Sequence, residues 1–418
     1  MKKIFVLLML SFMIKGYSQQ FNIQSDFRFR FEQRAGYAAL LSDSLQASTF
    51  IAQRARLIFN YSNEHIKIRI SPQNVRVWGD VATLSKTDLN NAIHEGYCDV
   101  KLNHKFSLKI GRQEIVLDDH RIFGNVDWSM QGRSHDAALV SIVPDSGHII
   151  QLGLAYNSLS ETNFRNPYTI NQYRSMQYAW YHGDFASGFG LSVLFLNHGL
   201  ELLESGKFKI KYSQTAGSRI SFAKKTWNID ATAYWQFGKI NINNVSAAYY
   251  SANVGKSLGR YLSLSAGIEY LSGKGQDDAS TEIKSFNPLF GTNHKFNGHM
   301  DYFYVGNHIN SVGLMDGYLR LGITKNKWSF KFEPHYFLAA ADVVSNGVKQ
   351  DNYLGTELDF NFQYKLYESV NLVGGISKML ATSTLETLRG GDKDASNYWA
   401  WFGVYLNPKL FSYQPNAQ

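Results

Sequence analysis

The chain of 418 residues has one cysteine and seven prolines. A single cysteine excludes a disulfide within the chain, and the alternation around Cys98 places it on an apolar face as a small hydrophobic side chain. Because there is no Pro/Gly/Ser-rich linker, residues 19–418 are predicted to form a single domain. After the N-terminus, no apolar run approaches the roughly 20 residues that a transmembrane helix needs.

Common enzyme motifs are also missing. The sequence has no G-x-S-x-G, H-E-x-x-H, P-loop or dinucleotide-binding motif, and the adjacent His135 and Asp136 would point to opposite sides of a strand. The formal net charge of +8 is too modest to indicate nucleic-acid binding. We therefore expect no enzyme, no nucleic-acid partner, no metal ion and no cofactor.

Residues 1–18 have the three parts of a secretory signal peptide. Lys2 and Lys3 form a basic start, residues 4–14 (IFVLLMLSFMI) are apolar, and small residues stand at positions 16 and 18. The pattern predicts cleavage near Ser18 and export of the mature chain; a buried N-terminal helix is the alternative.

The mature chain alternates oily and charged residues. In SDFRFRFEQR (25–34), Phe27, Phe29 and Phe31 point to one side of a strand, and Arg28 and Arg30 point to the other. Similar segments recur along the chain, without a convincing helical period. The fold is therefore predicted to be all-β, either a membrane barrel or a large soluble sandwich.

The connectors between these segments favour the barrel. Eight are short: 62–64, 103–105, 144–147, 184–188, 224–226, 255–259, 325–327 and 367–369. The other nine lie near 35–51, 79–91, 112–133, 158–173, 198–210, 238–243, 272–316, 339–352 and 381–396. Short turns at one rim and long loops at the other are typical of outer-membrane barrels. We predict a transmembrane antiparallel β-barrel of about 18 strands in the outer-membrane lipid of a Gram-negative bacterium, with the aromatic residues of 397–406 as interfacial anchors.

Alternation also predicts which charges face the lumen. The first five strands carry an excess of cations, whereas later strands carry acids such as Glu269, Glu333, Glu357 and Asp359. A basic wall opposite a near-neutral or acidic wall would create a transverse field that concentrates anions. The predicted pore-lining and solute-binding residues are Arg28, Arg30, Arg54, Arg56, Lys67, Arg69, Arg76, Lys109, Arg112 and Arg133.

Residues 111–137 (GRQEIVLDDHRIFGNVDWSMQGRSHDA) span a strand end, a long loop and the start of the next strand. So many charges beside the lumen predict a segment that folds inward and narrows the pore. Its acids are expected to bind the basic wall, which would leave Arg112 and Arg133 for a solute carboxylate. The predicted constriction residues are Glu114, Asp118, Asp119, Arg121 and Asp136.

This segment resembles the central motif of the alginate export family of outer-membrane porins. The matching frame is G-R-Q, R-x-x-G, D-W-x-x-Q-G-R and D-A, and residues 286–303 (FNPLFGTNHKFNGHMDYF) resemble a later loop of that family. The resemblance implies an 18-stranded barrel with an arginine-rich, anion-selective pore for acidic polysaccharide, in which Arg112 and Arg133 belong to the constriction. The long periplasmic gating loop of the family has no counterpart among the short turns expected here.

The sequence therefore predicts a channel for anionic solutes, such as an acidic poly- or oligosaccharide of the alginate type or another small anion. Two alternatives remain open: a general nutrient-uptake porin without a polysaccharide role, and a structural or adhesion barrel with a plugged lumen. Pore chemistry does not separate export from uptake, since a passive channel conducts both ways. The sequence points to no particular periplasmic partner.

Overall fold

The computed structural model describes residues 19–170, 172–304 and 311–414. The predicted signal peptide, residues 1–18, lies outside the described residues. The wall strands are β1 (Gln20–Ala35), β2 (Ser48–Ser62), β3 (Ile66–Val77), β4 (Asn91–Lys101), β5 (Phe106–Gln113), β6 (His135–Ile142), β7 (His148–Tyr156), β8 (Ser175–Phe185), β9 (Phe189–Glu204), β10 (Lys207–Lys224), β11 (Trp227–Ile240), β12 (Asn243–Leu258), β13 (Leu262–Leu271), β14 (Leu314–Lys325), β15 (Trp328–Leu338), β18 (Tyr353–Tyr367), β19 (Val370–Ala381), β20 (Tyr398–Leu406) and β21 (Lys409–Tyr413).

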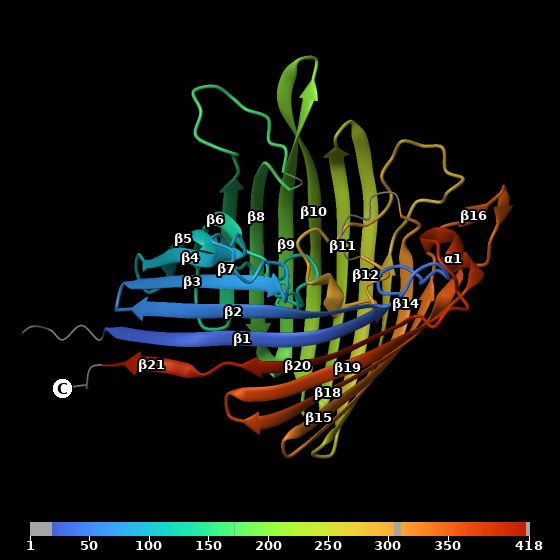
Figure 1. The fold of residues 1–418 in the computed structure, drawn as a ribbon. Coiled ribbons are helices and arrows are strands. Elements are labelled where there is room, and N and C mark those ends of the chain that lie inside the picture. Colours follow the sequence, from blue (N-terminus) through green and yellow to red (C-terminus); the bar gives the residue numbers. More distant parts are fainter. Residues whose placement is uncertain (1–18, 171, 305–310, 415–418) are drawn as a thin grey trace, which may run out of the picture.

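These strands form one closed antiparallel barrel (Figure 1). From β1 to β20, each wall strand pairs with the next wall strand, and both β20 and β21 pair with β1, which closes the barrel. Because β20 and β21 share one position in the wall, the described part of the chain forms 18 strands. The predicted fold class and strand number are confirmed.

The connectors hold little regular structure. The hairpin of β16 (Val344–Ser345) and β17 (Val348–Lys349) and the helix α1 (Ser383–Arg389) lie in the loops, together with two 3-10 turns, η1 (Ala186–Gly188) and η2 (Asn293–Lys295). Among the described residues, no helix is long and apolar enough to cross a membrane.

The two faces of the wall differ as the alternation predicts. On β1, Arg30 and Glu32 are 3% and 0% exposed, whereas Phe31 between them is 44% exposed. The outer face of β14 likewise carries the exposed Leu319 and Ile323. The apolar rows therefore point outward, and the charged rows point into the barrel.

One rim of the barrel has short turns and the other has loops, but one predicted loop is wrong. Residues 198–210 were expected to be a long connector, and they instead continue β9 and β10 as a paired hairpin that turns at Ser205 and Gly206. Both residues have positive φ, 52° and 75°. Residues 198–204 and 207–213 pair with each other as strands, so this hairpin projects beyond its neighbours (Figure 1).

The hydrophobic core of the protein lies inside the barrel, under two long loops. Residues 114–134, between β5 and β6, and residues 272–304, which follow β13, contribute Phe123, Phe286 and Met300 to one buried cluster. Inward-facing strand residues such as Trp399 complete it, at 1% exposure. The expectation that the aromatic residues of β20 act as interfacial anchors is thus wrong for Trp399, Trp401 and Tyr405, because their positions in the alternation face inward.

The facing of the wall can be tested by placing arginine on each side. An outward arginine at the bilayer mid-plane costs about 2–4 kcal/mol. We expect Leu319→Arg to lower the free energy of unfolding in lipid vesicles by about that much, as measured by denaturant titration. The inward-facing Ser251→Arg is the matched control and should cost less than about 1 kcal/mol. Equal losses in both variants would contradict the assigned faces.

Candidate functional site

Four arginines on the inner faces of β1 and β2 hold the loop between β5 and β6. Five successive carbonyl oxygens of this loop, from residue 127 to 131, each accept a hydrogen bond from one of them, over donor–acceptor distances of 2.5 to 3.3 Å. The pairs are Arg28–Asp127, Arg30–Trp128, Arg54–Ser129, Arg54–Met130 and Arg56–Gln131. We call residues 127–131 the clamped segment.

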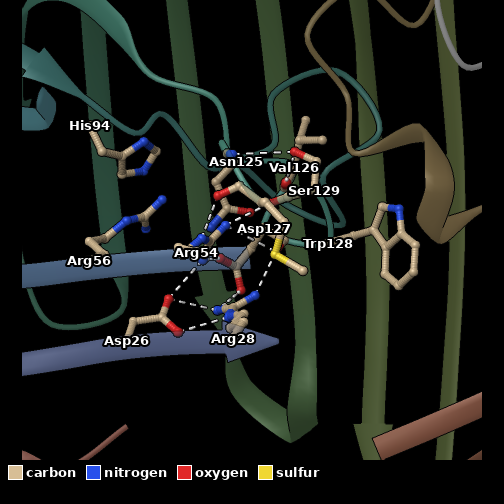
Figure 2. Close-up of polar contacts among 12 residues, drawn as sticks. Asp26, Arg28, Arg54, Arg56, His94, Asn125, Val126, Asp127, Trp128 and Ser129 are labelled. Atoms are coloured by element: carbon tan, nitrogen blue, oxygen red, sulfur yellow. Dashed lines mark hydrogen bonds and ion pairs between the residues drawn. The ribbon is translucent and has the colours of Figure 1, made fainter. Parts of the chain in front are cut away.

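Two carboxylates balance the charge at the centre of this contact (Figure 2). Arg54 Nη1 lies 2.7 Å from Asp26 Oδ2 and 2.9 Å from Asp127 Oδ1, and Arg28 contacts the same two acids. The Arg54 side chain is 0% exposed. Because the clamped segment has no strand or helix to satisfy its carbonyl oxygens, the arginines do so in its place.

The arginines are therefore covered by the loop. We expected them to face open water in the lumen, and this is wrong for Arg30, Arg54 and Arg56, which are 3%, 0% and 4% exposed. Trp128 adds to the cover, since its ring lies 3.6 Å from the Arg30 guanidinium carbon. Their charge contributes to the field in the lumen, but their hydrogen bonds are already used by the protein.

The acids expected to bind the basic wall have other partners. Glu114 contacts His94 at 2.8 Å and accepts from Asn125 at 2.9 Å. Asp118 accepts a hydrogen bond from the Trp180 indole nitrogen at 3.1 Å. Asp119 pairs with Arg219, at 3.7 Å. The partner of the basic wall is instead Asp127, so the predicted pairing was wrong although the loop does fold inward.

The opposite wall holds the second loop with reversed polarity. On β13 to β18 the carboxylates of Glu269, Asp316, Glu333, Glu357 and Asp359 are 0–3% exposed. The backbone N–H of Met300 donates to Glu357 at 2.7 Å, and that of His299 donates to Asp359 at 3.3 Å. Carboxylates thus accept from backbone amides here, whereas arginines donate to backbone carbonyls across the barrel.

Asn297 and Gly298 extend this contact. Asn297 Nδ2 donates to Glu269 at 2.9 Å and to Asp316 at 3.1 Å. Gly298 has φ +82°, and a Cβ at this position would lie 2.6 Å from the Glu357 carboxyl carbon. The position therefore needs glycine both for its backbone conformation and for the approach of the carboxylate.

The two loops meet in the middle of the lumen. The Gly124 N–H donates to the Phe290 carbonyl oxygen at 2.9 Å, and Arg133 Nη1 donates to the Gly291 carbonyl oxygen at 2.9 Å. The Trp128 and His294 rings stack with centroids 3.9 Å apart. Burial lowers the pKa of Arg133 to about 10, so it remains charged at neutral pH. The basic wall, two loops and the acidic wall thus form one continuous bridge across the barrel.

Of the other predicted site residues, Arg121 belongs to this bridge, whereas Arg69, Lys109 and Lys67 lie apart from it. Arg121 extends from the first loop to the acidic wall, where it pairs with Glu269 at 0% exposure. Arg69 pairs with Glu95 at 2.5 Å, and Lys109 lies over the Tyr97 ring at 4.9 Å. Lys67 is exposed near the short-turn end of β3.

Arg76, Arg112 and Asp136 lie on the outer face of the barrel, which corrects their assignment to the pore and constriction. Arg112 shares its face of β5 with the exposed Ile110 and pairs with Asp136 at 3.0 Å, with side-chain exposures of 44% and 64%. Arg76 stands opposite Gln53, the outward neighbour of the buried Arg54. We assumed that the loop begins at Arg112, but the strand continues to Gln113 and keeps its alternation.

Two cavities that share lining residues lie toward the short-turn ends of the strands. One has a volume of about 410 Å³, and its lining includes Trp128, Lys295, Lys331, Asn361, Trp401 and Tyr405. The other, of about 240 Å³, shares Lys295 and Lys331 and adds Arg219, Asp230 and Arg320. Lys331 is 46% exposed, and Lys295 Nζ donates to a carbonyl oxygen of Asp119 at 2.9 Å. Lys331 and Arg320 pair with Glu333, and Arg219 pairs with Asp119 and Asp230. Unlike the covered Arg30, Arg54 and Arg56, the lysines still border open space.

Sequence reasoning missed several of these residues. Asp26 alternates with Arg28 on the inner face of β1, and its parity alone could have identified it as a lumen acid. Trp401 could have been found in the same way on β20. Lys295 had no such signal, because its place depends on how residues 272–313 fold back onto the wall.

No protein-family model matches the chain, and no curated protein matches its sequence. Solved structures do share its fold. Acinetobacter baumannii OccAB1 has a TM-score of 0.64 at 10% identity, over 95% of this chain and 98% of that chain. Pseudomonas aeruginosa OccK2 (OpdF) in complex with glucuronate has a TM-score of 0.60 at 14% identity, over 94% and 97%. Pseudomonas aeruginosa OpdK with vanillate has a TM-score of 0.59 at 11% identity, over 94% and 99%.

These neighbours are Occ and Opd outer-membrane porins, and at such low identity the similarity shows the shared barrel alone. It supports an outer-membrane porin fold and not the alginate export family in particular. The resemblance of residues 111–137 and 286–303 to that family therefore remains a hypothesis. Both segments do lie in the two loops that meet inside the barrel.

Removal of Arg54 should loosen the clamped segment. Breaking a buried ion pair by deleting one partner costs about 3–5 kcal/mol, because the other charges stay buried without compensation. We expect Arg54→Met to speed hydrogen exchange in residues 126–131 and to raise single-channel conductance. Arg69→Met, on the same wall but paired with Glu95, is the control and should leave both unchanged. An unaltered loop in Arg54→Met would contradict the clamp.

Proposed function

We propose that the protein is a passive channel of the Gram-negative outer membrane for small anionic solutes, with an acidic oligosaccharide as the best candidate. The observation that carries this proposal is the pair of cavities beside the constriction, which Lys295 and Lys331 line together. The smaller cavity has four cations, Arg219, Lys295, Arg320 and Lys331, and three acids, Asp119, Asp230 and Glu269. An excess of one sign of charge in a cleft between low-dielectric walls raises the local concentration of counter-ions. The cations that act on a solute are then those in the cavities rather than the clamped arginines.

The aromatic residues of the larger cavity support a solute whose ring has an apolar face. Trp128, Trp401 and Tyr405 contribute ring surface to its lining, and Asn361 contributes an amide that can bind hydroxyl groups. A ring can lie against these aromatic faces while its carboxylate approaches Lys331. A sugar acid has both features, which is why we favour it over an unbranched anion.

The ligands of two structural neighbours are consistent with this choice. OccK2 (OpdF) was solved in complex with glucuronate and OpdK with vanillate, and both ligands carry a ring and a carboxylate. The two segments that resemble motifs of the alginate export family, residues 111–137 and 286–303, suggest an acidic sugar polymer. The alginate role is the finer part of the proposal and depends on these motifs.

A general nutrient porin is the second candidate, because the same barrel and the same neighbours suit it equally well. Such a porin would conduct anions without preferring ring-bearing ones. A plugged structural barrel is the third, and the bridge between the two loops is the feature that favours it. Conductance separates the third candidate from the first two, and ligand preference separates the first from the second.

Charge reversal in the cavities should change selectivity. We expect Lys295→Glu combined with Lys331→Glu to move the reversal potential in a bilayer salt gradient toward the cation value, because two positive charges on the path become negative. Lys239→Glu changes the same charge on the outer face of β11 and should not move it. An unchanged reversal potential in the double variant would place conduction elsewhere.

The ring preference can be tested separately. We expect glucuronate to interrupt the current of the native channel at lower concentration than acetate does, because ring stacking adds about 1 kcal/mol. Trp401→Ala should reduce that difference several-fold while leaving the reversal potential in chloride unchanged. A channel that treats glucuronate and acetate alike, before and after the substitution, would be a general porin.

A further inference from the structure

The outer wall of the barrel carries a hollow of about 570 Å³ across β1 to β4. Its apolar lining combines the larger side chains of Phe27, Leu57 and Ile93 with the smaller Ala55 and Pro72. Ala55 lies between the inward-pointing, buried Arg54 and Arg56, so the hollow belongs to the outward face. This is separate from the lumen and from the cavities described above.

The hollow follows from the local sequence of the strands. One row of outward residues crosses the sheet in register, namely Phe27, Ala55, Asn74 and Asn91. Beside it the register between β3 and β4 shifts at Ser71 and Pro72, where β4 carries one extra residue. A bulge of this kind bends the strand. The small side chains of Ala55 and Pro72 beside it leave a depression in the outer surface.

Two arginines border the hollow on the side of the long loops. Arg76 Nε donates to Asn74 Oδ1 at 2.7 Å, and Arg112 Nε donates to the Ile93 carbonyl oxygen at 3.0 Å. Asn74 Nδ2 in turn donates to Asn91 Oδ1 at 2.9 Å. Each guanidinium group thus contacts a residue that lines the hollow. The side-chain amides of Asn74 and Asn91 lie between the arginines and the apolar lining.

Both arginines keep capacity for a further acceptor. Arg76 pairs with Asp88, and Arg112 pairs with Asp136 through Nη1. In these hydrogen bonds Arg76 donates from Nε and Nη2, and Arg112 donates from Nε and Nη1. Nη1 of Arg76 and Nη2 of Arg112 can therefore donate to a further acceptor. The Arg112 pair is 44% and 64% exposed, and pairs this accessible contribute little stability, so an anion with several acceptor oxygens can compete for them.

We propose that this hollow binds one lipid with a net negative phosphate headgroup, with an acyl chain against Phe27, Ala55 and Pro72 and the phosphate at Arg76 and Arg112. The proposal rests on the membrane location given under the proposed function. An apolar hollow on a membrane-facing wall is filled by acyl chain, and basic residues at headgroup level bind anionic lipid phosphates. Along the wall, the apolar surface comes first, then the amides of Asn74 and Asn91, then the two guanidinium groups. A lipid has the same order: its acyl chain, its polar glycerol or sugar region, then its phosphate.

The test uses native mass spectrometry of the full mature chain in detergent. The probes are lipid A, phosphatidylglycerol, phosphatidylcholine with the same acyl chains as the phosphatidylglycerol, and inorganic phosphate. We expect one molecule of lipid A or phosphatidylglycerol per chain, at least tenfold weaker retention of phosphatidylcholine, and no displacement of lipid by millimolar inorganic phosphate. The stronger of the two anionic lipids identifies the source of the phosphate.

Paired variants separate the headgroup from the chain. Arg76→Gln with Arg112→Gln should weaken retention of the anionic lipids at least tenfold and leave phosphatidylcholine unchanged. Ala55→Trp fills the hollow and should weaken every lipid. The controls are Lys239→Gln, a cation at the same rim, and Ala231→Trp, an outward alanine on β11 away from the hollow.

Three results would overturn the proposal. The first is equal retention of phosphatidylcholine and phosphatidylglycerol by the native chain. The second is unchanged retention in the arginine variant. The third is a dimer in the native spectra that Ala55→Trp dissociates, since a second copy of the chain would then occupy the hollow. None of the variants lies in the lumen, so anion selectivity measured on the same samples reports on the proposed function independently.

Discussion

Two long loops fold into the lumen, and the hydrogen bonds of their backbone are the constraint on which the interior depends. Inside a barrel such groups need partners, because an unpaired buried carbonyl or amide costs about 1–3 kcal/mol. The carbonyl oxygens of residues 127–131 accept hydrogen bonds from the arginines of β1 and β2. The backbone N–H groups of His299 and Met300 donate hydrogen bonds to the carboxylates of Asp359 and Glu357. The charge asymmetry of the wall is therefore matched to the polarity of the backbone that each side binds.

This use of charge divides the lumen residues into two groups. Arg54 and Glu357 are fully covered, and their charges are neutralised or bound by the loops. Lys295 and Lys331 lie beside open cavities. A strongly basic strand is thus a poor guide to where a solute binds, because the same side chains that could bind an anion can bind a loop first.

The strand pattern could be predicted from the sequence because it is local. Side-chain alternation and turn length are properties of neighbouring residues, and they gave the all-β fold, the strand number and the facing of residues such as Phe31 and Arg30. The partners of the loop charges are not local: Arg28 meets Asp127 across 99 residues of chain. Strand ends failed for a different reason: Arg112 was assigned to the loop, but it lies within β5 and keeps the outward facing of Ile110.

The loop bridge also limits how the pore can change. Gly124 and Phe290 join the first loop to the second, and each loop is bound to its own wall. A solute that widened the passage through this bridge would have to break hydrogen bonds on both walls and separate the Trp128 and His294 rings. Moving the Lys295 or Lys331 side chain breaks fewer contacts, namely the Lys295 hydrogen bond to the Asp119 carbonyl oxygen and the Lys331 ion pair with Glu333. In the proposed channel, a solute that passes beside the two lysines therefore breaks fewer contacts than one that separates the two loops.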